Sequence, residues 1–257
     1  MSDAWALPAG SRDAWPDDYE RGRPGWPASV LDVVPLPREA VVLELAAGTG
    51  KLTRLLVPAF DRVVAVEPEA GMRRRLVRLC PGAEALEGTA ESIPLGDASA
   101  DAVFAAEAFH RFDAEAAVAE IARVLRPGGP LVLLWNLPNG PTTPSIASVE
   151  ALLRDRGPTR EQAGYDPLDL NTTRYASGDW KRAFAGAPFT AFEEAQRDHV
   201  QVVDREGLVS FFASMGWIGD RPDPERLPLL DEVRSLLDAG AYRRPWRTHV
   251  HWARRDD

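Results

Sequence analysis

The chain has 257 residues, of which 45% are hydrophobic and 27% are charged, and its formal net charge at pH 7 is −9. These values are typical of a globular protein that can bury a sizeable core, and they exclude a mostly disordered chain. The negative charge disfavours a nucleic-acid-binding role, because it repels the phosphate backbone at long range.

Short apolar runs alternate with helical patterns along the first half of the chain. Residues 1–37 are rich in Pro, Gly, Trp and Arg, with one short helix expected at Pro16–Arg21. The runs that follow predict strands buried on both faces at Val41–Leu45, Arg62–Val66, Ala83–Glu87, Ala102–Ala106 and Leu131–Trp135. Helices are expected between them at Lys51–Phe60, Gly71–Leu79 and Glu115–Leu125. This alternation predicts right-handed βαβ units and a parallel sheet.

The second half of the chain has a less regular pattern. Asn139–Pro144 is rich in turn residues. Helices are then expected at Ile146–Arg156, Asp179–Ala185, Glu206–Met215 and Pro228–Ala239. Strands are expected at Phe192–Val203 and Thr248–Trp252. We interpret residues 1–257 as a single domain with a helical insertion.

The first predicted strand ends in a turn of small residues, ELAAGTG, that closes at Gly50. Small side chains let a ligand approach the backbone at such a turn before a helix. A P-loop would need glycine at the place of Leu45 and serine or threonine at the place of Leu52, so that interpretation fails. A dinucleotide fingerprint would need a third glycine at the place of Thr53, so it is weak.

Two acidic residues support a third interpretation of the turn. Glu44 lies on the first predicted strand, and Glu67 lies at the end of the second. A carboxylate at the place of Glu67 can accept hydrogen bonds from both ribose hydroxyls of an adenosyl group. The alternative is an exposed glutamate in an ordinary turn before Pro68.

Residues from about Arg38 to Leu137 resemble the core of class I S-adenosylmethionine-dependent methyltransferases. The matching segments occur in the order and spacing of that family, and they read ELAAGTG, AVEPEAGM, GTAESIPL, DAVFAAEAFHRF and RVLRPGGPLVLLWN. The segment Tyr19–Pro27, YERGRPGWP, is similar to the start of the small-molecule branch that includes trans-aconitate and quinone-biosynthesis methyltransferases.

The resemblance implies an α/β fold with a Rossmann-like, doubly wound sheet of seven mostly parallel strands. It also implies an antiparallel edge strand and a helical insertion after the fifth strand. Within the single domain, residues 1–37 would form an N-terminal cap segment and residues 38–138 the cofactor-binding core. Residues 139–257 would form a helical lid and the closing strands.

The resemblance further implies which residues hold S-adenosyl-L-methionine. The turn Ala46–Gly50 would lie under the methionine part, Glu67 would hold the ribose, and Glu107 would pair with the methionine ammonium in preference to acting as a base. The expected cofactor-binding residues are Glu44, Ala46, Ala47, Gly48, Thr49, Gly50, Glu67, Pro68, Met72, Thr89, Ala90, Glu91, Glu107 and Phe109. The family usually has glycine where this chain has Ala46.

A catalytic side chain and a substrate pocket are also expected. Methyl transfer from a sulfonium needs mainly in-line alignment and exclusion of water. His110 is the candidate general base, and its alternative role is packing beside the cofactor. The candidate pocket residues are Tyr19, Arg23 and Arg111. Arg23 would suit an anionic substrate, and its alternative role is that of a surface arginine. Arg111 stands where close relatives often have tryptophan.

Further sequence features concern the location of the protein and the metal sites or disulfides that it could hold. No apolar run approaches the roughly 20 residues of a membrane span, and the N-terminus lacks the pattern of a secretory signal. Cys80 is the only cysteine, which excludes an internal disulfide and a multi-cysteine zinc site. His249 and His251 alternate on a predicted strand, but they lack a third ligand, so no metal is predicted. We expect a cytoplasmic protein without nucleic-acid or membrane partners.

The leading functional hypothesis is a methyltransferase that acts on a small-molecule acceptor. Two alternatives remain open at this point. One is a protein that binds S-adenosylmethionine without catalysis, in a regulatory role. The other is a nicotinamide-dependent oxidoreductase, which the missing third glycine disfavours.

Overall fold

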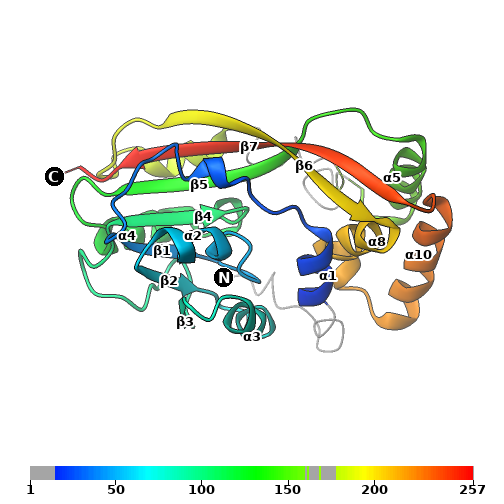
Figure 1. Cartoon of the computed structure of the whole chain (residues 1–257), viewed down its shortest axis with the longest axis horizontal. Coiled ribbons are helices and arrows are strands. Elements are labelled where there is room, and N and C mark those ends of the chain that lie inside the picture. Colours follow the sequence, from blue (N-terminus) through cyan, green and yellow to red (C-terminus); the bar gives the residue numbers. More distant parts are fainter. Residues whose placement is uncertain (1–14, 160, 162–167, 169–177, 257) are drawn as a thin grey trace. The chain divides into compact units, whose positions relative to one another are not determined.

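Seven strands form one sheet, in the order β3-β2-β1-β4-β5-β7-β6 (Figure 1). The structure is a computed structural model, and it describes residues 15–159, 161, 168 and 178–256. The strands are β1 (Val41–Leu45), β2 (Arg62–Val66), β3 (Glu84–Leu86), β4 (Ala102–Ala106), β5 (Pro130–Pro138), β6 (Glu193–Asp204) and β7 (Ala241–Arg254).

Strands β1 to β5 pair in parallel. Leu45, the last residue of β1, lies beside Val66 at the end of β2 and beside Ala105 near the end of β4. The carboxyl ends of these strands therefore meet at one edge of the sheet, which is where open α/β sheets bind their ligands. Strands β6 and β7 supply an antiparallel edge pair, and the predicted fold class is confirmed.

Helices connect the parallel strands as the alternating pattern predicts. The segments between β1 and β5 form α2 (Thr53–Ala59), α3 (Ala70–Leu79), the short 3₁₀ helix η2 (Phe109–Arg111) and α4 (Ala114–Val124). The other elements are α1 (Trp15–Gly22), η1 (Ala28–Val30), α5 (Pro144–Arg156), η3 (Asp179–Phe184), α8 (Arg205–Ala213), α9 (Gly216–Gly219) and α10 (Asp223–Leu236).

The chain divides into two compact units. One contains Gly25–Leu137, Arg174–His199 and Trp246–Asp257, and we call it the sheet unit. The other contains Met1–Pro24, Pro138–Thr173 and Val200–Pro245, and we call it the helical unit. The single-domain organisation expected from the sequence stays a prediction.

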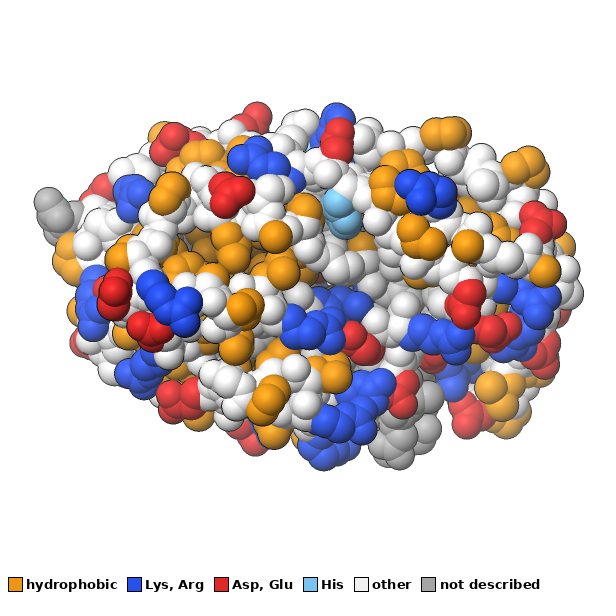
Figure 2. Space-filling view, viewed as in Figure 1, with side chains coloured by type: hydrophobic (Ala, Val, Ile, Leu, Met, Phe, Trp, Pro, Cys, Tyr) orange, Lys and Arg blue, Asp and Glu red, His pale blue; other side chains and the backbone are white. Residues whose placement is uncertain are grey.

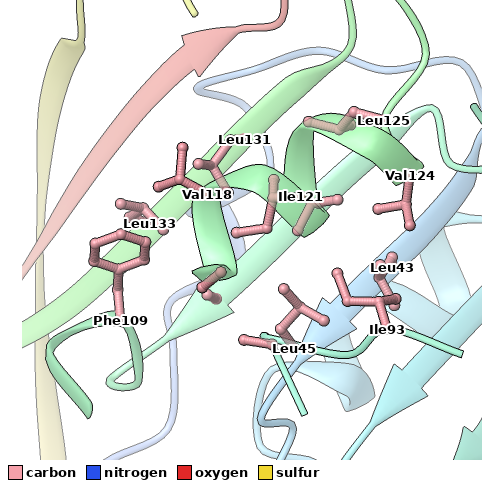
Figure 3. Packing of buried hydrophobic residues seen from close by; sticks show 14 of the residues in the cluster. Leu43, Leu45, Ile93, Phe109, Val118, Ile121, Val124, Leu125, Leu131 and Leu133 are labelled. Carbon is pink, nitrogen blue, oxygen red and sulfur yellow. The ribbon is translucent and has the colours of Figure 1, made fainter. Parts of the chain in front are cut away.

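Both faces of the parallel strands are buried, because successive side chains of a strand point to opposite faces. On one face Leu43 and Leu133 pack with the α4 side chains Val118 and Ile121 (Figure 3). On the other face Val42, Phe104 and Val132 share a cluster with Leu52 and Leu56, at the start of α2 and within it.

Local sequence signals explain where the helices of the sheet unit begin and end. The Glu69 carboxylate accepts a hydrogen bond from the Met72 amide and caps α3, and Asp113 caps α4 through the Ala116 amide. After α4, Pro127 cannot continue a helix, and Gly128 adopts a left-handed φ of 75°. These residues return the chain into β5.

In the helical unit, α1 lies close against α8. A Cβ added to Gly22 would come within 2.1 Å of the Phe211 amide nitrogen, so only glycine permits this approach. The indole Nε1 of Trp15 donates to the carbonyl oxygen of Ser214 at 3.1 Å. The buried guanidinium of Arg226 pairs with Asp18 at 3.2 Å, which ties α10 to α1.

The predicted helices after β5 differ from the structure mainly at their ends. Helix α10 begins at Asp223 rather than at Pro228, because Pro222 and the acidic first turn start it earlier and Pro228 lies inside it. The helix expected at Glu206–Met215 spans Arg205–Ala213, and Ser214 is its C-cap residue. Among the described residues, no helix has the length and hydropathy needed to cross a membrane.

Candidate active site

The turn after β1 has an unusual backbone. Ala46, Gly48 and Gly50 have φ values of 51°, 60° and 89°, all in the left-handed region. A Cβ on Gly50 would come within 2.6 Å of the Cys80 sulfur, so glycine is also required there for packing. Ala46 is the one residue of these three that carries a Cβ in a conformation that disfavours it.

We expect Ala46→Gly to raise the free energy of unfolding by about 0.5–1 kcal/mol, because relief of left-handed strain exceeds the entropic cost of glycine. The neighbouring substitution Ala47→Gly is the matched control, since Ala47 has a negative φ. It should lower the free energy of unfolding by about 0.5–1 kcal/mol. Urea denaturation of both variants measures the difference, and an equal loss in both would contradict the strain argument.

Glu67 joins the end of β2 to the turn after β1. Its Oε2 accepts a hydrogen bond from the Gly48 amide at 2.8 Å, and its Oε1 accepts one from the Glu69 amide at 2.9 Å. The side chain is only 5% exposed. Burial raises the pKa of Glu67, while the two amide hydrogen bonds and the positive charge of Arg111 act in the opposite direction. Arg111, a predicted pocket residue, therefore lies close enough to Glu67 for its positive charge to affect the Glu67 carboxylate.

Arg73 on α3 is a residue that the sequence interpretation missed. Its Nη1 donates to the carbonyl oxygens of Glu67 at 2.7 Å and of Pro68 at 3.0 Å. Its Nη2 pairs with the Glu87 carboxylate at 2.6 Å. Arg73 therefore fixes the backbone that carries Glu67, and nothing in the local pattern of α3 distinguishes it from the neighbouring arginines.

Glu44 is buried beneath the turn. The Thr53 hydroxyl donates to its Oε2 at 2.6 Å, which links β1 to the first residue of α2. Burial, together with the nearby charge of Glu67, raises the pKa of Glu44 to about 8. The side chain is therefore mostly neutral at pH 7. Its predicted role in cofactor binding stays a prediction.

We expect Glu44→Gln to remove a pH-dependent loss of stability. Because the pKa of Glu44 is higher in the folded chain than in the unfolded chain, its stabilising effect is full below the unfolded value of about 4.5 and is lost as the pH rises through about 8. The wild type should therefore lose more free energy of unfolding than the variant between about pH 5 and 9.

Urea denaturation at several pH values tests this expectation. Glu120→Gln is the control, because the ion pair with Arg123 lowers the pKa of Glu120 and its contribution changes only at acid pH. Equal pH dependence in the wild type and Glu44→Gln would contradict the assignment of a neutral Glu44.

Glu107 directly follows β4 and has a left-handed conformation with φ of 53°. Its amide donates to the carbonyl oxygen of Leu134, and its Oε1 accepts a hydrogen bond from the Asn136 amide at 2.6 Å. The carboxylate is thus held between the carboxyl ends of β4 and β5.

Asn136 is a buried side chain at the centre of a polar network that the sequence interpretation also missed. Its Oδ1 accepts hydrogen bonds from the Thr248 hydroxyl at 2.6 Å and from His199 Nε2 at 3.1 Å. Its Nδ2 donates to the Gly25 carbonyl oxygen at 3.1 Å. Because an amide oxygen only accepts, His199 carries a proton on Nε2, and burial lowers the pKa of His199. An asparagine at the end of an apolar strand was the one available signal.

The residues of η2 have different environments. Phe109 is 1% exposed, and its ring lies 5.3 Å from that of Phe184 and 5.7 Å from that of Phe112. Its predicted contact with the cofactor stays a prediction. His110 is half-buried, and its Nδ1 accepts a hydrogen bond from the indole of Trp135 at 3.4 Å. The neutral ring that accepts at Nδ1 carries its proton on Nε2.

The loop after β3 is tied to α4. Thr89 and Ser92 form an antiparallel bridge, and Ala90 between them is buried. The Glu91 carboxylate accepts a hydrogen bond from the Asp113 amide at 2.9 Å. Met72 on α3 is also buried, whereas Pro68 is exposed. The adenine contacts expected of this group stay predictions.

Tyr19 and Arg23 lie in the helical unit. The guanidinium carbon of Arg23 lies 5.8 Å from the centre of the Tyr19 ring, and its Nε donates to the Ser214 hydroxyl at 2.8 Å. Their predicted place in a substrate pocket stays a prediction. Among the residues that the structure describes, no group of three or more His, Cys, Asp or Glu side chains is arranged to hold a metal ion.

Several known proteins resemble this chain in sequence. Residues 43–133 match the methyltransferase domain family. An uncharacterized methyltransferase of Mycobacterium tuberculosis is 38% identical over 220 residues, which cover 85% of this chain and 82% of that protein. The chain belongs to the class I S-adenosylmethionine-dependent methyltransferases.

Other methyltransferases resemble the chain over most of its length. A methyltransferase-like protein of Schizosaccharomyces pombe is 31% identical over 228 residues, which cover 86% of this chain and 84% of that protein. The solved phosphoethanolamine N-methyltransferase 2 of Haemonchus contortus, in complex with S-adenosylhomocysteine, shares the fold with a TM-score of 0.55 and 15% identity. That match covers 96% of this chain and 58% of the other. The predicted enzyme class and cofactor are confirmed at the level of the methyltransferase family.

Proposed function

We propose that this methyltransferase transfers a methyl group in line from S-adenosyl-L-methionine to a small-molecule acceptor. The observation that most supports the proposal is the buried Glu67 carboxylate, which accepts a hydrogen bond from the Gly48 amide at the carboxyl edge of the sheet. A fixed acidic acceptor beside a small-residue turn suits an adenosyl ribose.

The residues present fit the cofactor. A carboxylate has about four acceptor positions, so Glu67 can accept from two ribose hydroxyls in addition to the two amides that it already binds. The backbone of the turn Ala46–Gly50 would support the methionine part. The Glu107 carboxylate, held by the Asn136 amide, would accept from the methionine ammonium.

The proposed contribution of the chain to the reaction is alignment. The bound sulfonium supplies an activated methyl group and a neutral leaving group. The protein residues must then hold the acceptor in line and exclude water. His110 is the proposed orienting side chain, since its ring accepts from Trp135 at Nδ1 and presents the Nε2 proton as a donor.

We expect His110→Asn to keep most of the turnover number, because the asparagine amide can also donate a hydrogen bond. A general base would instead lose roughly 10²–10⁴-fold in kcat on replacement. The measurement is the pH–rate profile of both proteins on an identified acceptor. If the wild type shows an ionisation between about pH 5.5 and 7.5 that His110→Asn abolishes together with most of the activity, His110 is the base and the orienting role is wrong.

Two experiments test the proposed function as a whole. Calorimetric titration of the full chain with S-adenosylhomocysteine and with NADH separates the methyltransferase from the nicotinamide-dependent alternative; tight binding of NADH alone would overturn the proposal. Incubation with methyl-labelled cofactor and a panel of small acids, alcohols and amines then tests turnover. Cofactor binding without transfer to any acceptor would favour a regulatory protein.

The distribution of charged side chains on the surface bears on the kind of substrate that we propose. Figure 2 shows basic and acidic side chains interspersed over the face that it draws, rather than a single-sign field of the kind that attracts nucleic acid. We therefore propose a small molecule as the substrate. The cytoplasmic location and the similarity to the trans-aconitate and quinone-biosynthesis branch stay predictions.

A further inference from the structure

Two arginines of the helical unit converge on one aromatic ring. The guanidinium carbon of Arg244, on β7, lies 4.0 Å from the centre of the Phe211 ring, and that of Arg23 lies 5.1 Å from the same centre. Phe211 belongs to α8 and is 3% exposed. The two cations come from positions far apart in the chain, so the fold brings them together at α8.

The position of Arg23 is defined by hydrogen bonds. Its Nε donates to the Ser214 hydroxyl at 2.8 Å, and its Nη2 donates to the Ser214 carbonyl oxygen at 3.3 Å. The Ser214 hydroxyl in turn donates to the Phe211 carbonyl oxygen at 2.7 Å. Ser214 therefore holds the Arg23 guanidinium at the end of α8, next to the ring that Arg244 also contacts.

The electrostatic environment of this pair favours an anion. Burial and, to a smaller extent, the positive charge of Arg23 lower the pKa of Arg244 to about 10, whereas Glu150 on α5 acts in the opposite direction. Two positive charges that influence each other next to an apolar ring create a strong local positive potential, because the ring screens charge poorly.

We propose that Arg23 and Arg244 together bind an anionic oxygen group, a carboxylate or a phosphate. Planar guanidinium groups match both anions through paired hydrogen bonds. Stacking of both groups against Phe211 orders them before the anion arrives, so less side-chain entropy is lost on binding.

The test is calorimetric titration of the full chain with malonate and with inorganic phosphate at constant ionic strength. We expect at least one anion to bind the wild type, and we expect Arg23→Gln and Arg244→Gln each to weaken that binding at least tenfold. Malonate and phosphate are separate arms, so binding of one alone identifies the carboxylate or the phosphate as the preferred group.

Arg234→Gln is the matched control. Arg234 lies in the same unit and its loss changes the net charge equally, but it is paired with Glu206 and Asp231. Its variant should bind the anions as the wild type does. Circular dichroism checks the fold of each variant, and Arg244→Lys, which keeps the charge and loses the planar fork, replaces Arg244→Gln if the latter does not fold.

Two results would overturn the proposal. One is the absence of binding of either anion to the wild type, and the other is equal affinity in the wild type, Arg23→Gln and the Arg244 variant. Titration of the same proteins with S-adenosylhomocysteine distinguishes failure of the proposed anion site from failure of the proposed methyltransferase function. Loss of anion binding by the variants with intact cofactor binding supports the arginine site, whereas failure of the wild type to bind the cofactor contradicts the proposed function alone.

Discussion

Replacement of Glu67 by alanine is expected to weaken the binding of S-adenosylhomocysteine at least tenfold. The ribose hydroxyls would lose a charged acceptor, and hydrogen bonds to charged groups contribute about 1.5–3 kcal/mol each. The Gly48 amide would also lose its partner, so the turn that supports the methionine part would be less ordered. Isothermal titration calorimetry measures the change in affinity.

Glu87→Gln is the control for Glu67→Ala. Glu87 is an exposed carboxylate that follows β3 and pairs with Arg73, so its loss alters charge near the same arginine without removing the proposed ribose acceptor. Its affinity for S-adenosylhomocysteine should stay close to that of the wild type. Unchanged affinity of Glu67→Ala with a native circular dichroism spectrum would show that the ribose is held elsewhere.

Replacement of Asn136 by alanine is expected to lower the free energy of unfolding by about 1–3 kcal/mol. The substitution leaves the Thr248 hydroxyl, the His199 Nε2–H and the Gly25 carbonyl oxygen without their common partner. The Thr248 hydroxyl is fully buried, and an unsatisfied buried group costs about 1–3 kcal/mol, whereas the exposed Gly25 and the half-buried His199 can bond to water instead. Urea denaturation followed by circular dichroism gives the value.

A double-mutant cycle with Thr248→Val tests whether the loss comes from this network. Thr248→Val alone removes one hydroxyl and should cost about 1 kcal/mol. The double variant should be more stable than the sum of the two losses implies, because the hydroxyl that Asn136→Ala leaves unsatisfied is absent. Strict additivity of the two losses would mean that the two side chains do not share a hydrogen bond.

The parallel core could be predicted from the sequence because its signals are local. Val41–Leu45, Arg62–Val66 and Ala102–Ala106 have the same bounds in the structure as in the prediction. Each is a short apolar run followed by a helical pattern, so the local sequence preference and the observed secondary structure are the same. Glu67 could be located for the same reason, since it follows directly on a predicted strand.

Strand β7 shows what local patterns do not reveal. It begins at Ala241, well before the predicted start at Thr248, and it includes Arg243, Arg244 and Pro245. Charged residues and a proline disfavour a strand locally. Tertiary pairing overrides these propensities, and the sequence pattern alone therefore misses half of the strand.

The Asn136 network could not be predicted for a related reason. Asn136, His199 and Thr248 lie on β5, β6 and β7, and they meet only because the sheet order places these strands together. No spacing between the three residues indicates that order. Arg23 and Arg244 likewise lie far apart in the chain, and only the fold brings both to Phe211.

The order of the strands in the sheet also affects how the chain folds while it is being synthesised. Strand β7 follows β6 in the chain but lies between β5 and β6 in the sheet. Until β7 has left the ribosome, β5 exposes an unpaired edge of apolar residues, and β6 has no neighbour to pair with. Such long-range pairing slows folding and leaves a partly folded chain open to aggregation. Closure of the sheet therefore depends on β7, which lies between β5 on one side and β6 on the other.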